Sequence, residues 1–214
     1  MTRNTTIAFL LFSTVYVLLN FIPDLRVHWM LKIFPIILLG IEVSKNETFK
    51  QGGVLLGAIA ASMTGDMLLH FDFFVLGLSA FLIAQIQYAF IFYQYRNTEK
   101  GRTGLTLMLT IYLVGMTVLL YPYLDDMMIP VLAYLVVISI MGFFAIGSIL
   151  PLKWAVLGAL FFILSDSLIA INKFIYAVPF ERVLVMSTYY AAQWMLIKGF
   201  LENNISTDEL EVEN

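Results

Sequence analysis

The chain has 214 residues, of which 61% are hydrophobic and 13% are charged, and its formal net charge is −3. Its mean hydropathy is +0.89. A soluble domain has about 45–50% apolar and about 25% charged residues, so this composition excludes soluble globular and disordered proteins. It favours a polytopic helical membrane protein.

Residue types that are absent or rare argue against several kinds of functional site. The chain has no cysteine, and therefore no disulfide or thiolate chemistry. Its two histidines, His28 and His70, lack the spacing of metal ligands, so we expect no metal. The chain has no basic patch with interleaved aromatic residues, so nucleic acid is not an expected partner.

Apolar segments long enough, or nearly long enough, to cross a bilayer follow one another along the chain. Arg3 precedes the first segment and no small-residue cleavage site follows before Pro23, so we interpret this segment as a membrane helix and not as a signal peptide. The connectors are too short for a soluble domain. We therefore predict an all-α membrane protein with one eight-helix transmembrane domain over 1–201 and an acidic, disordered tail over 202–214. The eight predicted segments are about 5–22, 28–43, 52–71, 73–93, 104–121, 128–148, 152–172 and 183–201.

Lysine and arginine residues beside the segment ends predict the orientation. With eight helices, both termini lie on the side that carries eight of these residues, and the other side carries only four. The positive-inside rule then places both termini in the cytoplasm. We expect a multi-pass protein of a cell membrane, such as the bacterial inner membrane. The four residues on the other side are Arg26, Lys32, Lys173 and Arg182.

Two carboxylates lie within predicted segments, Asp66 in 52–71 and Asp166 in 152–172. A carboxylate in the hydrocarbon region costs about 2.5–3.5 kcal/mol on insertion scales, so each is a candidate functional residue. Both segments run outward from the cytoplasm, and a rise of 1.5 Å per residue puts both carboxylates roughly 21–22 Å from the inner surface. If these two helices pack against each other, the carboxylates face one cavity.

A short pattern recurs in the same two segments. Leu56-Gly57-Ala58 precedes Asp66-Met67-Leu68-Leu69, and Leu157-Gly158-Ala159 precedes Asp166-Ser167-Leu168-Ile169, with spacings that differ by one residue. A parallel four-plus-four internal repeat, as in some transporter folds, fits this recurrence.

Two neighbouring carboxyl groups are suited to acid–base chemistry, because one member of such a pair is protonated while the other is ionised. At an ether-type bond, the first donates a proton and the second activates water. The flanking Ser165 and Ser167 are expected to hydrogen-bond to Asp166, which favours Asp166 as the ionised member, or to permit close helix packing. The alternative is that each aspartate only bonds a neighbouring helix.

Further polar side chains in or beside the segments are candidate substrate-binding groups. Lys32 either extends to the lipid headgroups or receives a phosphate. Gln193 lies on the same helical face as Tyr189, four residues earlier. The other candidates are Tyr134, within a segment, and Asn172, at the end of one.

Three other classes compete with a hydrolase. An intramembrane aspartyl protease requires Tyr-Asp and Gly-x-Gly-Asp, but Met63-Thr64-Gly65-Asp66 lacks the first glycine and Leu164-Ser165-Asp166 lacks the tyrosine, so we disfavour it. A proton- or ion-coupled transporter would use the carboxylates as a relay. A non-catalytic membrane protein would use them only for structure.

Several motifs together resemble the YhhN family of eight-span proteins, some of which are lysoplasmalogenases. In two places the chain departs from the family pattern: Ile33 stands where a proline is usual, and Gln85 stands where a histidine is common. The Gln85 departure puts a proton-transfer role at that position in doubt. The motifs are Lys32 with Pro35, Gly65-Asp66-x-Leu68-Leu69, Phe74-x-x-Gly77-x-x-x-Phe81, Tyr88, Tyr134 with Met141, Gly158-Ala159-x-x-Phe162-x-x-Ser165-Asp166-Ser167, and Tyr189-Tyr190-Ala191-Ala192-Gln193.

This resemblance implies hydrolysis of the vinyl-ether bond of a lysoplasmalogen to a fatty aldehyde and a glycerophospho-headgroup. The partners it implies are a lysophospholipid substrate and membrane lipid, with no metal or nucleotide cofactor. Asp66 and Asp166 would be the catalytic pair, and the sequence does not assign either of them as the acid.

Overall fold

The computed structural model describes residues 1–22, 29–97 and 102–212, with the backbone only at 29 and over 203–212. Over these residues the chain is helical, and its only β pairing is an isolated bridge between Arg96 and Ser148. The predicted all-α fold is therefore confirmed. The helices are α1 (Arg3–Leu19), α2 (Trp29–Ser44), α3 (Gly52–His70), α4 (Phe74–Gln94), α5 (Thr103–Leu120), α6 (Met128–Ile146), α7 (Leu157–Phe174) and α8 (Glu181–Val212).

Short helical turns complete several of these elements. Two 3₁₀ turns, Tyr121–Tyr123 and Asp125–Met127, join α5 to α6, and a π-helical turn, Leu152–Val156, leads into α7. The helices lie within a few residues of the predicted segments except at the C-terminus, where α8 continues to Val212. The structure gives no side chains beyond Glu202 and does not describe residues 213 and 214. The disordered acidic tail expected over 202–214 therefore stays a prediction.

The outer surface of the bundle is apolar. Five helical stretches in the described part of the chain are long and apolar enough to cross a membrane, and α1 is a shorter apolar helix. Large side chains such as Met108, Val118 and Ile129 are exposed by 68%, 68% and 81%. Extensive exposed apolar surface is rare on soluble monomers. These properties are those of an integral membrane protein. The five stretches are Gly52–His70, Phe74–Gln94, Thr103–Tyr123, Asp125–Ile146 and Leu152–Phe174.

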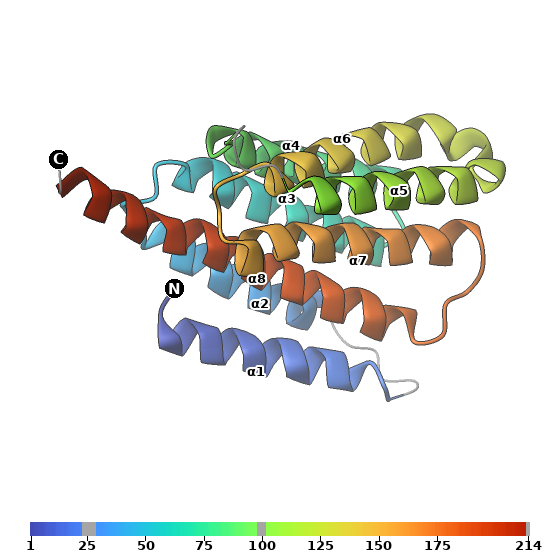
Figure 1. Ribbon diagram of the computed structural model, residues 1–214. Coiled ribbons are helices and arrows are strands. Elements are labelled where there is room, and N and C mark those ends of the chain that lie inside the picture. Colours follow the sequence, from blue (N-terminus) through green and yellow to red (C-terminus); the bar gives the residue numbers. More distant parts are fainter. Residues whose placement is uncertain (23–28, 98–101, 213–214) are drawn as a thin grey trace.

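The helices form an elongated bundle (Figure 1). The beginning of α1 and the last turns of α8 lie at the same end, which we call the terminal end, and the α5–α6 and α7–α8 connections lie at the opposite end. The most extensive helix pairs are α3 with α4, α7 with α8, and α4 with α6. The expected direct packing of α3 on α7 is not among the extensive contacts, which corrects that expectation.

Side chains of α4 and α8 fill the space between α3 and α7. The ring of Phe81 on α4 packs edge-on against Phe162 of α7 and Tyr189 of α8, with centroids 6.1 Å and 6.0 Å apart. On its other side this ring covers Gly65 of α3, where an added Cβ would lie 2.6 Å from a ring carbon. The glycine before Asp66 is therefore required for close packing of α3 on α4.

A second close approach joins α7 to α8. A Cβ added at Gly158 would lie 2.7 Å from the backbone nitrogen of Leu196. Backbone atoms cannot move aside as a flexible side chain can, so only glycine allows the two helices to come this close. This contact fixes the position of α7, and with it the position of Asp166.

Candidate active site

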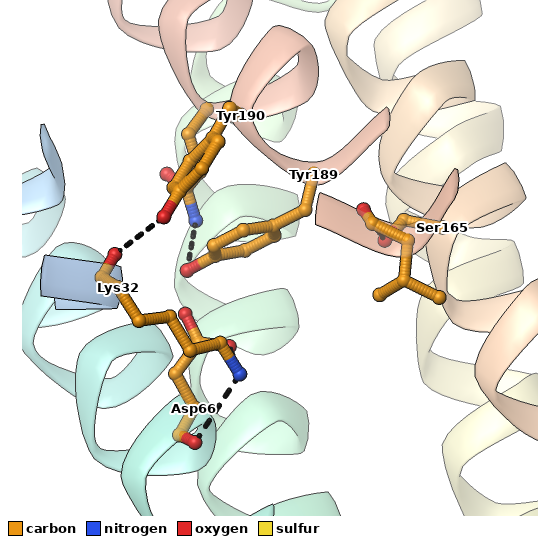
Figure 2. Close-up of polar contacts among 7 residues, drawn as sticks. Lys32, Asp66, Ser165, Tyr189 and Tyr190 are labelled. Atoms are coloured by element: carbon orange, nitrogen blue, oxygen red, sulfur yellow. Dashed lines mark hydrogen bonds and ion pairs between the residues drawn. The ribbon is translucent and has the colours of Figure 1, made fainter. Parts of the chain in front are cut away.

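Asp66 forms a buried ion pair with Lys32. Its side chain is on α3, the residue is 4% exposed, and its Oδ1 lies 2.8 Å from the Nζ of Lys32 on α2 (Figure 2). The same ammonium donates to the backbone carbonyl of Asp66 at 3.4 Å. Among the described residues, Oδ2 of Asp66 has no hydrogen-bond partner. A buried charge is costly unless it is paired, so this cation stabilises the carboxylate where it lies.

Lys32 is itself held in place from α8. The hydroxyl of Tyr190 donates to the backbone carbonyl of Lys32 at 2.6 Å, as Figure 2 shows. The tyrosine thus ties α8 to the turn of α2 from which the ammonium extends toward Asp66.

Lys32 and Asp66 line a cavity of about 340 Å³, which we call the polar cavity. It lies at the end of the bundle opposite the terminal end, because its walls come from the last turns of α1, α3 and α7 and the first turns of α4 and α8. Burial raises the pKa of the Glu181 carboxyl in its wall, and the nearby charges of Arg182 and Lys32 oppose that shift. The charged side chains of the polar cavity are Lys32, Lys173, Arg182, Asp66, Asp72 and Glu181.

Asp166 on α7 has a different partner. Its Oδ2 accepts a hydrogen bond from the hydroxyl of Tyr134 on α6. The amide nitrogen of Gln85 on α4 donates to that hydroxyl at 3.4 Å. Within the described residues no lysine or arginine forms an ion pair with Asp166, since the two ion pairs found there are Lys32–Asp66 and Lys198–Glu202.

Asp166 and Tyr134 line a second cavity of about 50 Å³, which we call the apolar cavity. Apart from these two residues and Ser167, its walls are hydrophobic side chains of α3, α4, α5, α6 and α7. Examples are Leu113, Ile138 and Ile163. The two aspartates therefore face environments of opposite character.

The two cavities adjoin each other. Leu69, Phe74 and Ile169 line both of them, and we call these three side chains the shared wall. Leu69 follows Asp66 by three residues, and Ile169 follows Asp166 by three, so each lies about one turn from its aspartate on the same helical face. In place of the single cavity expected from the sequence, the structure has two adjoining ones.

The two serines do not hydrogen-bond to Asp166. Ser165 donates to the backbone carbonyl of Val185 at 3.2 Å, and Ser167 donates to that of Ile163 at 2.8 Å. A serine hydroxyl on a helix readily bonds the carbonyl one turn earlier, as Ser167 does. The expected support for Asp166 is therefore absent, and with it the reason for regarding Asp166 as the ionised member.

The structure separates the five predicted substrate-binding residues. Lys32 and Asn172 line the polar cavity, and Tyr134 lines the apolar cavity. Asn172 also accepts a hydrogen bond from the backbone of Val178 at 2.9 Å, which shapes the α7–α8 connection.

The other two, Tyr189 and Gln193, line neither cavity. They belong to a buried chain in which Gln193 donates to the hydroxyl of Tyr189 at 3.3 Å and accepts from Tyr88 at 2.8 Å. All three residues are at most 3% exposed. Their polar groups thus lie inside the helix packing, where the hydroxyl of Tyr189 also interacts with Asp66.

Sequence reasoning missed several residues of the polar cavity. Lys173 and Arg182 were used only as markers of orientation, and Asp72 and Glu181 were assigned no role. The available signal was their position, because all four flank connectors on the same side of the predicted membrane. Asp72 has a left-handed backbone with φ of 64° in the tight turn between α3 and α4, a conformation that aspartate tolerates better than most residues.

The fold and its cavities define a helical integral membrane protein with charged side chains lining a cavity at one end of the bundle. In the described part of the chain, no group of three or more His, Cys, Asp or Glu side chains is arranged to hold a metal ion. The chain belongs to the YhhN family, whose model matches residues 27–200.

Curated relatives of the chain carry the name lysoplasmalogenase. It is 32% identical over 155 residues to one from Mycobacterium bovis, covering 68% of this chain and 59% of the relative. It is 36% identical over 155 residues to human lysoplasmalogenase TMEM86A, covering 66% of this chain and 62% of the relative. It is 30% identical over 209 residues to rat lysoplasmalogenase TMEM86B, covering 94% of this chain and 85% of the relative. The chain thus spans less than two thirds of the mycobacterial protein. No solved structure matches it.

Proposed function

We propose that this protein is a membrane-embedded hydrolase that cleaves the vinyl-ether bond of lysoplasmalogen, releasing a fatty aldehyde and a glycerophospho-headgroup. Asp66 and Asp166 are the acid–base pair of this proposal. The observation that carries it is the pair of adjoining cavities, one polar and one apolar, each lined by one of these carboxyl groups. The names of the curated relatives support the same activity.

The cavities match the two halves of a lysophospholipid. The cations Lys173 and Arg182 in the polar cavity suit a phosphate, and Asn172 adds a polar amide. The apolar cavity suits the beginning of the hydrocarbon chain, and its volume of about 50 Å³ leaves the rest of the chain to extend into lipid. The bond between headgroup and chain then lies at the shared wall, between the two aspartates.

A vinyl ether requires the groups that this site provides. Hydrolysis begins when an acid protonates the vinyl carbon that does not carry oxygen, which leaves an oxocarbenium cation. A carboxylate stabilises that cation and orients the water that captures it. One protonated and one ionised carboxyl on opposite sides of the bond meet both needs.

The topology that accompanies this function has eight crossings. The beginning of α1 and the end of α8 lie at the same end of the bundle, as an even number of crossings requires (Figure 1). The excess of lysine and arginine at that end favours cytoplasmic termini, in a cell membrane such as the bacterial inner membrane. The polar cavity then opens on the other side. Asp66 is the fifteenth residue counted from Gly52, and Asp166 is the fifteenth counted from Leu152, where the π-helical turn before α7 begins, which supports a four-plus-four repeat.

The direct test measures aldehyde release by the purified protein in detergent or proteoliposomes. Lysoplasmalogen should be consumed with release of one aldehyde per molecule. Two matched lipids, a 1-acyl and a saturated 1-alkyl lysophospholipid with the same headgroup, should be left intact because neither carries a vinyl ether. Absence of aldehyde from lysoplasmalogen would refute the proposal. Proton flux in proteoliposomes without lipid consumption would instead favour a proton-coupled transporter.

A further inference from the structure

The two aspartates differ in the group that each contacts, and this difference assigns their roles. Resting on the proposed hydrolase function, we infer that Asp166 is the proton donor to carbon and that Asp66 is the ionised group that takes a proton from water. Lys32 is the positioning residue that keeps Asp66 ionised, and Tyr134 is the positioning residue that orients the Asp166 carboxyl, in place of the substrate-binding role expected for both. The assignment reverses the one suggested by the serines beside Asp166.

The surroundings of Asp66 favour the carboxylate. Lys32 contacts its Oδ1 at 2.8 Å and its backbone carbonyl at 3.4 Å, so the cation is held at two points. Its Oδ2 is buried and has no hydrogen-bond partner among the described residues, and the residue lines the polar cavity. This oxygen is the acceptor that we assign to the proton of the attacking water. The titratable and charged groups that face Asp66 or share its cavity are Tyr16 of α1, Lys32 of α2, His70 of α3, Asp72 of the α3–α4 turn, Lys173 of α7, and Glu181, Arg182, Tyr189 and Tyr190 of α8.

The surroundings of Asp166 favour the protonated acid. The apolar cavity offers its carboxyl no cation, and a carboxylate in such a setting loses solvation without a charge to replace it. Gln85 donates to the oxygen of Tyr134, so the single proton of that hydroxyl is directed at Oδ2 of Asp166. The other oxygen, Oδ1, is then the one to which we assign the acid proton. Within the described residues, the titratable groups around Asp166 are Tyr134 of α6 and, across the shared wall, Asp66 of α3.

With this assignment, every proton transferred in one turnover is accounted for. Asp166 transfers its proton to the vinyl carbon that does not carry oxygen, and the electron pair of the double bond forms the new C–H bond. Water attacks the resulting oxocarbenium carbon and passes one proton to Asp66. The product is a hemiacetal, with Asp166 ionised and Asp66 protonated.

The second half of the reaction, the breakdown of the hemiacetal, restores the protonation states of both aspartates. The hemiacetal hydroxyl gives its proton to Asp166, the carbon–oxygen bond to glycerol breaks, and the glycerol oxygen takes its proton from Asp66. One water is consumed, one aldehyde and one alcohol leave, and both aspartates return to their first states. No proton from outside the site is required.

The pH dependence of kcat/KM for aldehyde release tests the assignment. An enzyme that needs one ionised and one protonated group gives a bell-shaped profile with an acidic and an alkaline limb. When two titrating groups interact, the apparent pKa values read from the two limbs describe the pair and not either residue. Each aspartate must therefore be matched to its limb by removing the residue that contacts it. Lys32→Met removes the cation at Asp66 and makes that carboxyl harder to ionise. The acidic limb should move to higher pH by about 1 unit or more, while the alkaline limb stays in place.

The matched control is Lys198→Met, which removes a paired, partly buried cation on α8 that lines neither cavity. It should move neither limb. Movement of the alkaline limb in Lys32→Met would make Asp66 the acid and overturn the inference. A rise in KM with both limbs unmoved would make Lys32 a phosphate contact and would also overturn it.

Tyr134→Phe gives the independent second readout, which also covers the case in which Lys32→Met does not fold. Loss of the hydroxyl makes Asp166 harder to ionise, so the alkaline limb should move to higher pH and the acidic limb should not move. The control Tyr88→Phe loses a buried hydroxyl bonded to Gln193 and should move neither limb. An acidic limb that moves in Tyr134→Phe overturns the inference. An inactive wild-type protein would instead refute the proposed function itself.

Discussion

The polar and apolar cavities contain the same catalytic residue type in opposite surroundings. Asp66 and Asp166 lie equally far from Gly52 and Leu152, the starts of their helical stretches, yet α2 brings a lysine to the first and α6 brings a tyrosine to the second. The short motifs around the two aspartates give no sign of this difference. The comparison teaches that the neighbouring helix, and not the local motif, sets the chemistry of a buried carboxyl group in this fold.

Replacing either aspartate should have the largest effect. Asp66→Asn removes the acceptor and Asp166→Asn removes the acid, so each should lower kcat for aldehyde release by about 10²–10⁴-fold. The double variant should be little worse than either single one, because the two groups act as a unit. Asp126→Asn, which changes an exposed carboxylate that lines neither cavity, is the control and should retain full activity. Near-full activity in either single variant would refute the assignment of Asp66 and Asp166 as a catalytic pair.

Changes in the cavity walls should separate headgroup from chain recognition. Arg182→Gln in the polar cavity should raise KM by about tenfold with little change in kcat, as expected for the loss of one charged hydrogen bond. Steady-state kinetics with lysoplasmalogens of two chain lengths would measure this, and the effect should be equal for both lengths.

Ile138→Trp in the apolar cavity should act differently. The larger ring fills the space that we assign to the hydrocarbon chain, so kcat/KM should fall by about tenfold or more, which corresponds to at least about 1.4 kcal/mol. The loss should be greater for a long chain than for a short one. An equal effect of chain length in Ile138→Trp and Arg182→Gln would remove the distinction between the cavities.

The residues that precede the two aspartates should differ in their contribution to stability. Gly65→Ala places a methyl group 2.6 Å from the ring of Phe81, and overpacking of this kind costs about 1–3 kcal/mol. Ser165→Ala loses one hydrogen bond to the carbonyl of Val185, worth about 0.5–1.5 kcal/mol. Thermal unfolding in detergent measures both. The second variant Phe81→Leu should restore part of the stability lost in Gly65→Ala, and failure to do so would contradict the packing explanation.

The smallest expected effect concerns the wall of the polar cavity. Burial raises the pKa of Glu181, so this carboxyl binds its proton more tightly in the folded protein than in the unfolded one. Stability should therefore fall as pH rises from the unfolded pKa through the folded one. In Glu181→Gln that part of the pH dependence should disappear, with a Tm at neutral pH higher than that of the wild type by less than about 3 °C. If Glu181→Gln has the same pH dependence of Tm as the wild type, the proposed contribution of Glu181 to stability is contradicted.

The helices could be predicted from the sequence because each is a long apolar run between polar connectors. The expected limits of α3, 52–71, and of α4, 73–93, agree with Gly52–His70 and Phe74–Gln94 within one residue. The end of α8 could not be predicted, because residues beyond 201 are polar and the apolar pattern that marks a membrane helix stops there. Periodicity also could not reveal which helices pack together, so extensive packing of α3 on α7 was expected wrongly.

The candidate site was predictable in part. A carboxylate within an apolar segment stands out in any sequence, and Asp66 and Asp166 were found in this way. Their partners could not be assigned, because Lys32 and Asp66 are separated by 34 residues and Tyr134 and Asp166 by 32, and only tertiary packing brings them together. The hydrogen bonds expected from Ser165 and Ser167 to Asp166 do not form, because backbone carbonyls of Val185 on α8 and of Ile163 one turn earlier accept from these hydroxyls instead.

The central claim is that one aspartate is protonated and the other ionised at neutral pH, and infrared difference spectroscopy observes this directly. A protonated carboxylic acid has a carbonyl stretching band that a carboxylate lacks. The wild-type protein should show such a band, which should disappear in Asp166→Asn and persist in Asp66→Asn. A band that disappears in Asp66→Asn and persists in Asp166→Asn would contradict the account.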